Sequence, residues 1–92
     1  MNMGIVAVKI KIMPESPTTN IKNIEMGAKI MIEKDGGKNV TFHEEPIAFG
    51  LKAVFLSFAW PEEKELEELE EKLGKIKYVK SAEVSDIRRA IG

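Results

Sequence analysis

The side chains that could perform chemistry in this 92-residue chain are few and scattered. Cysteine is absent and histidine occurs once, at His43, so the sequence offers neither a thiolate nucleophile nor a histidine pair to hold a metal. The serines have no histidine nearby in the sequence and stand in no Gly-x-Ser-x-Gly turn; they are Ser16, Ser57, Ser81 and Ser85. The sequence therefore predicts no catalytic residue, no metal site and no cofactor.

Two other patterns that could signal chemistry have structural explanations. The acidic run from Glu62 to Glu71 accompanies leucines at helical spacing, which is typical of a helix with one solvated face rather than of a metal site. The turn Asp35-Gly36-Gly37 is too short for a phosphate-binding loop, and no helix follows it. It is interpreted as the end of a helix.

Two local features do indicate a binding function. Within residues 44–50 (EEPIAFG), Phe49 stands at a hairpin tip between small residues, where an apolar ring often contacts a partner. The structural alternative is a ring that folds back over the edge of the core. Near the end of the chain, Arg88 and Arg89 alternate with apolar residues, which indicates an ordered end, although terminal basic residues also serve solubility alone.

The spacing of apolar residues predicts the elements that position these features. Residues 4–13 alternate between apolar and polar side chains, as a half-buried strand does. A helix is predicted from an N-cap at Asn20 to about Lys34. A second helix is predicted from Pro61, whose missing N–H suits a first helical turn, to Gly74. The remaining strands are predicted over residues 38–47, 51–60 and 76–87.

The resulting element order is β-α-β-β-α-β. With right-handed crossovers it predicts an α+β, ferredoxin-like βαββαβ sandwich, a four-stranded antiparallel sheet of strand order 4-1-3-2 with two helices on one face. The third and fourth strands then run parallel, so the end of the fourth lies opposite the hairpin that begins the third. A strand of about nine residues at ~3.3 Å per residue separates these ends by roughly 30 Å. Phe49 and Arg89 therefore cannot form one compact site.

Composition limits the classes of protein that the chain can represent. Its length fits a single domain, residues 1–92. The chain carries 14 basic and 15 acidic residues, so it lacks the basic excess that strong non-specific nucleic-acid binding requires. No apolar run approaches membrane-spanning length, and the N-terminus lacks the marks of a signal peptide. We expect a cytoplasmic domain that contacts neither nucleic acid nor membrane directly.

A fold of this kind leaves alternatives that use the helix-free face of the sheet. Phe55 and Phe58 loosely match the aromatic signature of RNA-recognition modules, whereas Ala53 occupies the place of a stacking ring. On the same face, Ile5, Ala7 and Phe55 could join two copies of the chain. An RNA-binding module and a homo-oligomerising module therefore stand as the alternative functions.

Three segments in order along the chain resemble a known family. They are Met13–Pro17 (MPESP) after the first strand, Glu44–Leu51 (EEPIAFGL) around the hairpin, and Asp86–Arg89 (DIRR) near the end. The sequence resembles the elongation factor 1-beta family of archaea, and also the C-terminal exchange domain of the eukaryotic factor. The resemblance covers essentially the whole chain and implies the βαββαβ fold.

The resemblance implies a guanine-nucleotide exchange factor, which is not an enzyme and acts by protein binding without covalent chemistry. The implied partner is the GTPase elongation factor 1-alpha, in its GDP-bound and nucleotide-free states. One end of the family's domain disrupts the Mg²⁺ and phosphate site with a basic residue that falls by spacing on Arg89, with Arg88 as the alternative. The other end binds the second domain of the GTPase with a phenylalanine that falls on Phe49. The wider hairpin contact comprises Pro46, Ile47 and Gly50.

Overall fold

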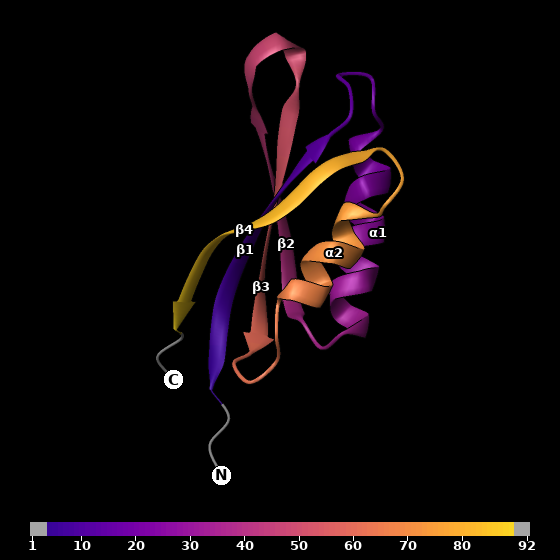
Figure 1. The fold of residues 1–92 in the computed structure, drawn as a ribbon. Coiled ribbons are helices and arrows are strands. Elements are labelled where there is room, and N and C mark those ends of the chain that lie inside the picture. The colour runs from indigo at the N-terminus through magenta and orange to yellow at the C-terminus, as the bar shows by residue number, and fades with distance from the viewer. Residues whose placement is uncertain (1–3, 90–92) are drawn as a thin grey trace.

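The computed structural model describes residues 4–89, which form one antiparallel sheet covered on one face by two helices (Figure 1). The sheet order is β2-β3-β1-β4, which is the predicted order 4-1-3-2 counted from the other edge. The predicted α+β, ferredoxin-like βαββαβ fold is therefore confirmed. The elements are β1 (Ile5–Pro14), α1 (Ile21–Lys34), β2 (Lys38–Pro46), the single 3-10 turn η1 (Ala48–Gly50), β3 (Lys52–Pro61), α2 (Glu67–Gly74) and β4 (Val79–Arg89).

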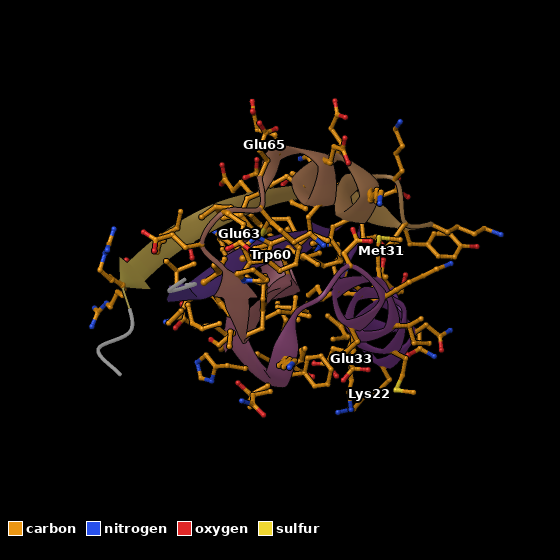
Figure 2. The ribbon with its side chains drawn as sticks, turned by 90° about the horizontal axis from the view of Figure 1, so that it is seen from below. Lys22, Met31, Glu33, Trp60, Glu63 and Glu65 are labelled. Carbon is orange, nitrogen blue, oxygen red and sulfur yellow. The ribbon has the colours of Figure 1, made fainter. Side chains whose placement is uncertain are left out.

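The alternation along β1 builds the core. The even-numbered residues from Val6 to Ile12 are buried beneath the helices, while Ile5, Ala7 and Lys9 face away from them. Trp60 near the end of β3 is also buried (Figure 2). Its indole Nε1 donates a hydrogen bond to the Lys64 carbonyl at 3.1 Å. Each large apolar side chain buried in this way contributes about 1.5–3 kcal/mol.

Both ends of α1 follow from the local sequence. The Asn20 side chain accepts hydrogen bonds from the backbone N–H groups of Lys22 and Asn23, as an N-cap does. At the other end, Gly36 has φ 110°, and the Gly37 N–H donates to the Ile32 carbonyl at 2.8 Å. This is the Schellman arrangement that glycine permits.

The prediction that α2 begins at Pro61 is wrong. Pro61 is the last residue of β3 and pairs with Ile5 of β1. The next residue, Glu62, donates its N–H to the Gly4 carbonyl at 2.9 Å, so contact with β1 continues into the loop. Helix α2 begins only at Glu67. Proline fits both the first turn of a helix and the end of a strand. Pairing with β1 decides between these two positions for Pro61, and the local sequence does not encode that pairing.

Strand β4 begins at Val79, three residues later than predicted, and continues to Arg89. The delay arises because the chain leaving α2 makes further turns, in which the Ile76 N–H donates to the Leu73 carbonyl at 3.2 Å and the Val79 N–H to the Ile76 carbonyl at 3.0 Å. Tyr78 ends these turns with a left-handed backbone, φ 71°.

Candidate functional site

The β2–β3 hairpin holds the Phe49 side chain in solvent. Phe49 has φ 63° and ψ 31°, and Gly50 follows with φ 77°, so two consecutive left-handed residues reverse the chain. The turn is closed by the Ile47 N–H, which donates to the Leu51 carbonyl at 2.7 Å. The Phe49 side chain is 93% exposed. The alternative of a ring folded back over the core is therefore wrong.

The left-handed backbone of Phe49 costs of order 1 kcal/mol, because such conformations suit glycine and not bulky residues. That cost is not offset by burial of the ring. The residues around it are also apolar and accessible: Pro46 ends β2 opposite Lys52, and Ile47 is 37% exposed. The hairpin tip, which we define as residues 46–50, is therefore a small projecting apolar surface.

The loop after β1 lies beside this tip. A methyl group added at Gly50 would lie 3.7 Å from the Pro17 Cβ, which is van der Waals contact. A shallow hollow of about 310 Å³ separates the hairpin base from this loop and the start of α1, and Gly50, Pro17 and Lys22 line parts of it. The hairpin tip therefore stands on a base that includes the 15–19 loop.

A charged cluster joins α1 to the hairpin. Lys22 Nζ lies 3.7 Å from Glu25 Oε1 and 3.8 Å from Glu44 Oε2, and Lys22 itself lies at the outer surface of α1 (Figure 2). Burial raises the pKa of Glu25, and so does its hydrogen bond with Glu44, while the Lys22 ammonium acts in the opposite direction. The three side chains tie the first turns of α1 to the strand that leads into the hairpin tip.

The two arginines at the other end of the sheet point to opposite faces. Arg89 lies opposite the core residue Val6, whereas Arg88 lies opposite Ala7, which faces away from the helices. Arg89 Nη2 bonds to the Glu62 carboxylate in the β3–α2 loop. Arg88 Nε instead bonds to Asp86 Oδ2 at 2.9 Å on its own strand. Both guanidinium groups are largely exposed, so these ion pairs are weak and exchangeable.

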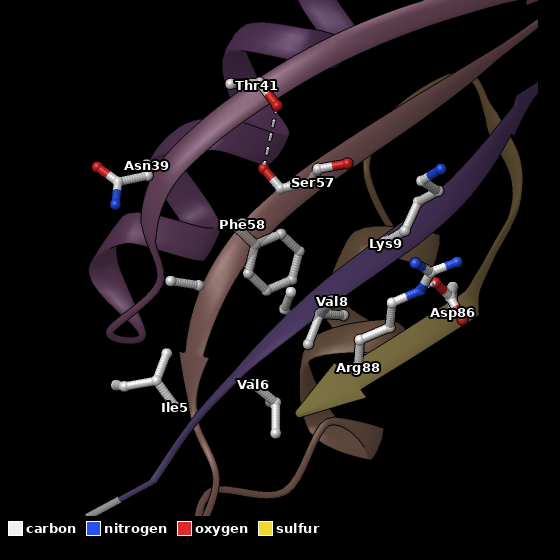
Figure 3. A pocket seen from close by; sticks show the side chains of 12 residues that line it. Ile5, Val6, Val8, Lys9, Asn39, Thr41, Ser57, Phe58, Asp86 and Arg88 are labelled. Carbon is white, nitrogen blue, oxygen red and sulfur yellow. Dashed lines mark hydrogen bonds and ion pairs between the residues drawn. The ribbon is translucent and has the colours of Figure 1, made fainter. Parts of the chain in front are cut away.

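Arg88 borders a hollow of about 420 Å³ on the helix-free face of the sheet (Figure 3). Lys9 and Asp86 lie at its arginine side and Thr41 and Ser57 at the other, where the Thr41 hydroxyl donates to the Ser57 carbonyl at 3.5 Å. On the same face, Lys9 Nζ lies 6.0 Å from the ring centre of Phe55. Ala53, which occupies the place of a stacking ring in RNA-recognition modules, is fully buried. No cluster of three or more metal-ligating side chains occurs among residues 4–89.

The strand register separates the two ends. Trp60 of β3 pairs with Val6, which in turn pairs with Arg89, whereas Lys52 at the other end of β3 lies beside the hairpin tip. The eight residue steps between Trp60 and Lys52 span about 26 Å. This agrees with a molecule whose longest dimension is 47 Å. Phe49 and Arg89 are not brought together, and each stands at its own end of the same sheet.

Two residues near these ends were not singled out from the sequence. Glu25 occupies the apolar face of α1, one turn from Ile21 and Ala28, and this helical spacing is a signal that could have identified a buried carboxyl group. Glu62 cannot be identified from the sequence as the partner of Arg89, because the local pattern predicts a helix there and the contact depends on the loop that the structure has instead.

Comparison with known proteins agrees with the fold. Residues 7–90 match the family model described as the EF-1 guanine nucleotide exchange domain. A protein named elongation factor 1-beta from Methanosarcina barkeri is 40% identical over 88 residues, which cover 95% of this chain and 99% of that protein. The protein of the same name from Methanococcus vannielii is 36% identical over 86 residues, or 92% of this chain and 97% of that protein.

Neither helix of residues 4–89 has the length and apolar character needed to cross a membrane. The family match includes both the hairpin tip and the arginine-bearing strand, so the two exposed ends belong to the region shared with these relatives. With this match over nearly its whole length and with the expected βαββαβ sandwich, the chain belongs to the EF-1 guanine nucleotide exchange domain family.

Proposed function

We propose that this chain promotes GDP release from the GTPase elongation factor 1-alpha by binding it at two separated surfaces. The observation that carries the proposal is the position of two exposed side chains, Phe49 and Arg89, at opposite ends of one hydrogen-bonded sheet. A partner with two or more domains can contact both ends at once, whereas a small ligand cannot span them. Membership of the exchange-domain family supports the identity of the partner and the reaction.

The hairpin tip is proposed to bind the second domain of the GTPase. Its ring is already in solvent and is held by a tight turn, so binding requires little rearrangement of this chain. Burying a phenylalanine side chain contributes about 1.5–3 kcal/mol. Pro46, Ile47 and Gly50 complete the contact around Phe49.

The arginine end is proposed to disrupt the Mg²⁺ and phosphate site of the GTPase. A guanidinium group supplies positive charge where the Mg²⁺ ion is displaced. We assign this role to Arg89 rather than Arg88, because Arg89 ends β4 and is held by a loop residue, while Arg88 faces the flat side of the sheet. Arg89 would exchange the Glu62 carboxylate for groups of the partner.

The energy required is modest. A thousandfold faster release of GDP corresponds to a barrier lowered by about 4 kcal/mol. The chain must bind the nucleotide-free GTPase more tightly than the GDP-bound GTPase, and by linkage each ligand then weakens the other. No covalent step is involved, and the activity belongs to translation elongation in the cytoplasm.

The direct test is the release of fluorescent GDP from elongation factor 1-alpha with and without this chain. Arg89→Ala is expected to slow stimulated release at least tenfold while changing the affinity for the GTPase much less. Arg88→Ala is the matched control, since it removes a similarly exposed guanidinium from the other face. Equal release with and without the chain overturns the proposed function. If Arg88→Ala slows stimulated GDP release and Arg89→Ala does not, only the assignment of the arginine is overturned.

A further inference from the structure

Tyr78 is a second aromatic residue displayed by a strained backbone. Its φ of 71° lies in the left-handed region, and its side chain is 53% exposed. For a bulky residue this conformation persists only when neighbouring contacts fix it. Two backbone hydrogen bonds do so here: the Glu15 N–H donates to the Tyr78 carbonyl at 2.9 Å, and the Val79 N–H donates to the Ile76 carbonyl at 3.0 Å.

A pocket of about 470 Å³ lies beside the Tyr78 ring. Ile24 and Ile76 give it apolar surface, while Ser16, Thr19 and Asn23 supply hydroxyl and amide groups. On the Tyr78 ring itself, Lys77 Nζ lies 5.2 Å from the ring centre. The pocket thus combines an apolar interior with hydrogen-bonding groups and a nearby positive charge, which is the composition of a site for a protein side chain.

This pocket adjoins the hollow at the base of the hairpin tip. Ser16, Thr19 and Asn20 line both the Tyr78 pocket and the neighbouring hollow of about 310 Å³, and Gly50 lines the far side of that hollow. The 15–19 loop also lies beside both: Pro17 is close enough to Gly50 that a methyl group added there would touch it, and Glu15 is hydrogen-bonded to Tyr78. In Figure 1 the hairpin tip, this loop and the α2–β4 turn all lie toward the same end of the molecule.

We propose that Tyr78 and its pocket form a second anchor at this end for the same GTPase that the hairpin tip binds. The inference rests on the proposed function and extends its hairpin contact by an adjoining surface. The pocket fits a partner segment that inserts one apolar side chain between Ile24 and Ile76 and carries an acidic residue toward Lys77. Tyrosine suits such a role because a rigid, amphipathic ring loses little conformational entropy on binding.

The test measures the affinity of the full chain for nucleotide-free elongation factor 1-alpha by titration calorimetry. Tyr78→Asn removes the ring while keeping a residue that tolerates a left-handed backbone, and Tyr78→Phe keeps the ring. The expected result is about a tenfold weaker complex for Tyr78→Asn and less than a twofold change for Tyr78→Phe. Ile30→Asn is the control, because Ile30 is similarly exposed (61%) and lines neither hollow.

Thermal unfolding of each variant establishes that the fold is intact. A Tyr78→Asn variant that binds as tightly as the wild type, or no more weakly than Ile30→Asn, overturns the second anchor while leaving the proposed function in place. Failure of the wild-type chain to bind elongation factor 1-alpha overturns both.

Discussion

Replacing Phe49 by glycine is expected to leave the fold intact or stabilise it while weakening partner binding. The ring is 93% exposed, so its removal takes almost no apolar area out of the core. Glycine relieves the left-handed strain at φ 63°, a gain of roughly 1–2 kcal/mol. It also makes the unfolded chain more flexible, which opposes this gain by about 0.4–1 kcal/mol. The net expectation lies between no change and a stabilisation of about 1.6 kcal/mol.

Binding is expected to change in the opposite direction. A buried aromatic anchor contributes about 2 kcal/mol or more to an interface, which is roughly a 30-fold change in dissociation constant. Urea denaturation measures the change in the free energy of unfolding. Calorimetric titration of the nucleotide-free GTPase measures the change in dissociation constant. In thermal unfolding, a gain of about 1 kcal/mol would raise Tm by roughly 4–8 °C for a chain of this size.

Each half of this expectation can fail separately. A loss of more than 1 kcal/mol of stability in the Phe49→Gly variant would mean that the ring packs against the protein in solution. An unchanged dissociation constant would remove the hairpin tip from the interface. Phe49→Asn is the companion variant: asparagine tolerates the left-handed backbone and adds less flexibility to the unfolded chain, so it should match glycine in binding.

Outcomes are expected for four further variants. Glu62→Gln should speed stimulated GDP release a few-fold in the fluorescence assay, because it frees Arg89 from its ion pair; no acceleration would mean that the pair does not restrain Arg89. The free energy of unfolding of the Glu62→Gln variant should differ from that of the wild type by less than about 1 kcal/mol, since the ion pair is exposed. Glu25 has a pKa raised above its ordinary 4.5, so the folded state holds the Glu25 proton more tightly than the unfolded state does. The folded state therefore loses stability as pH rises above 4.5. Urea titrations at several pH values should therefore show Glu25→Gln gaining on the wild type between pH 4.5 and neutrality, and parallel curves would contradict this. Gly27→Ala should stabilise the chain by about 1 kcal/mol, because open space surrounds a methyl group there. Gly37→Ala should cost about 1–3 kcal/mol, because its methyl group would lie 2.3 Å from an isoleucine side chain, and equal melting temperatures would refute the contrast.

The parts of the fold that short-range patterns determine could be predicted from the sequence. The alternation of β1 and the Asn20 cap depend on residues within one or two turns or strand steps of each other. The start of α2 could not be predicted, because proline fits both the first turn of a helix and the end of a strand. Only the pairing of Pro61 with Ile5, which is distant in sequence, distinguishes the two.

The site shows the same division between local and long-range information. The exposed turn around Phe49 follows from its small neighbours and the glycine after it. The faces of the two arginines do not, because an extra residue in β4, Ser85, interrupts the pairing between Lys9 and Ile10 of β1. Beyond this bulge Arg88 falls on the helix-free face and Arg89 on the other. A side-chain period of two, continued without the bulge, would have exchanged them.

The unbroken β3 strand between the hairpin tip and Trp60 gives the chain a fixed internal spacing. A rigid protein with two binding surfaces binds tightly only to a target whose two sites are separated by the same distance as those surfaces. Its second contact then forms at a high effective concentration. A target whose domains rotate and alter that distance keeps one contact and loses the advantage of the other. Such a protein binds preferentially to one domain arrangement of its target and dissociates when that arrangement changes.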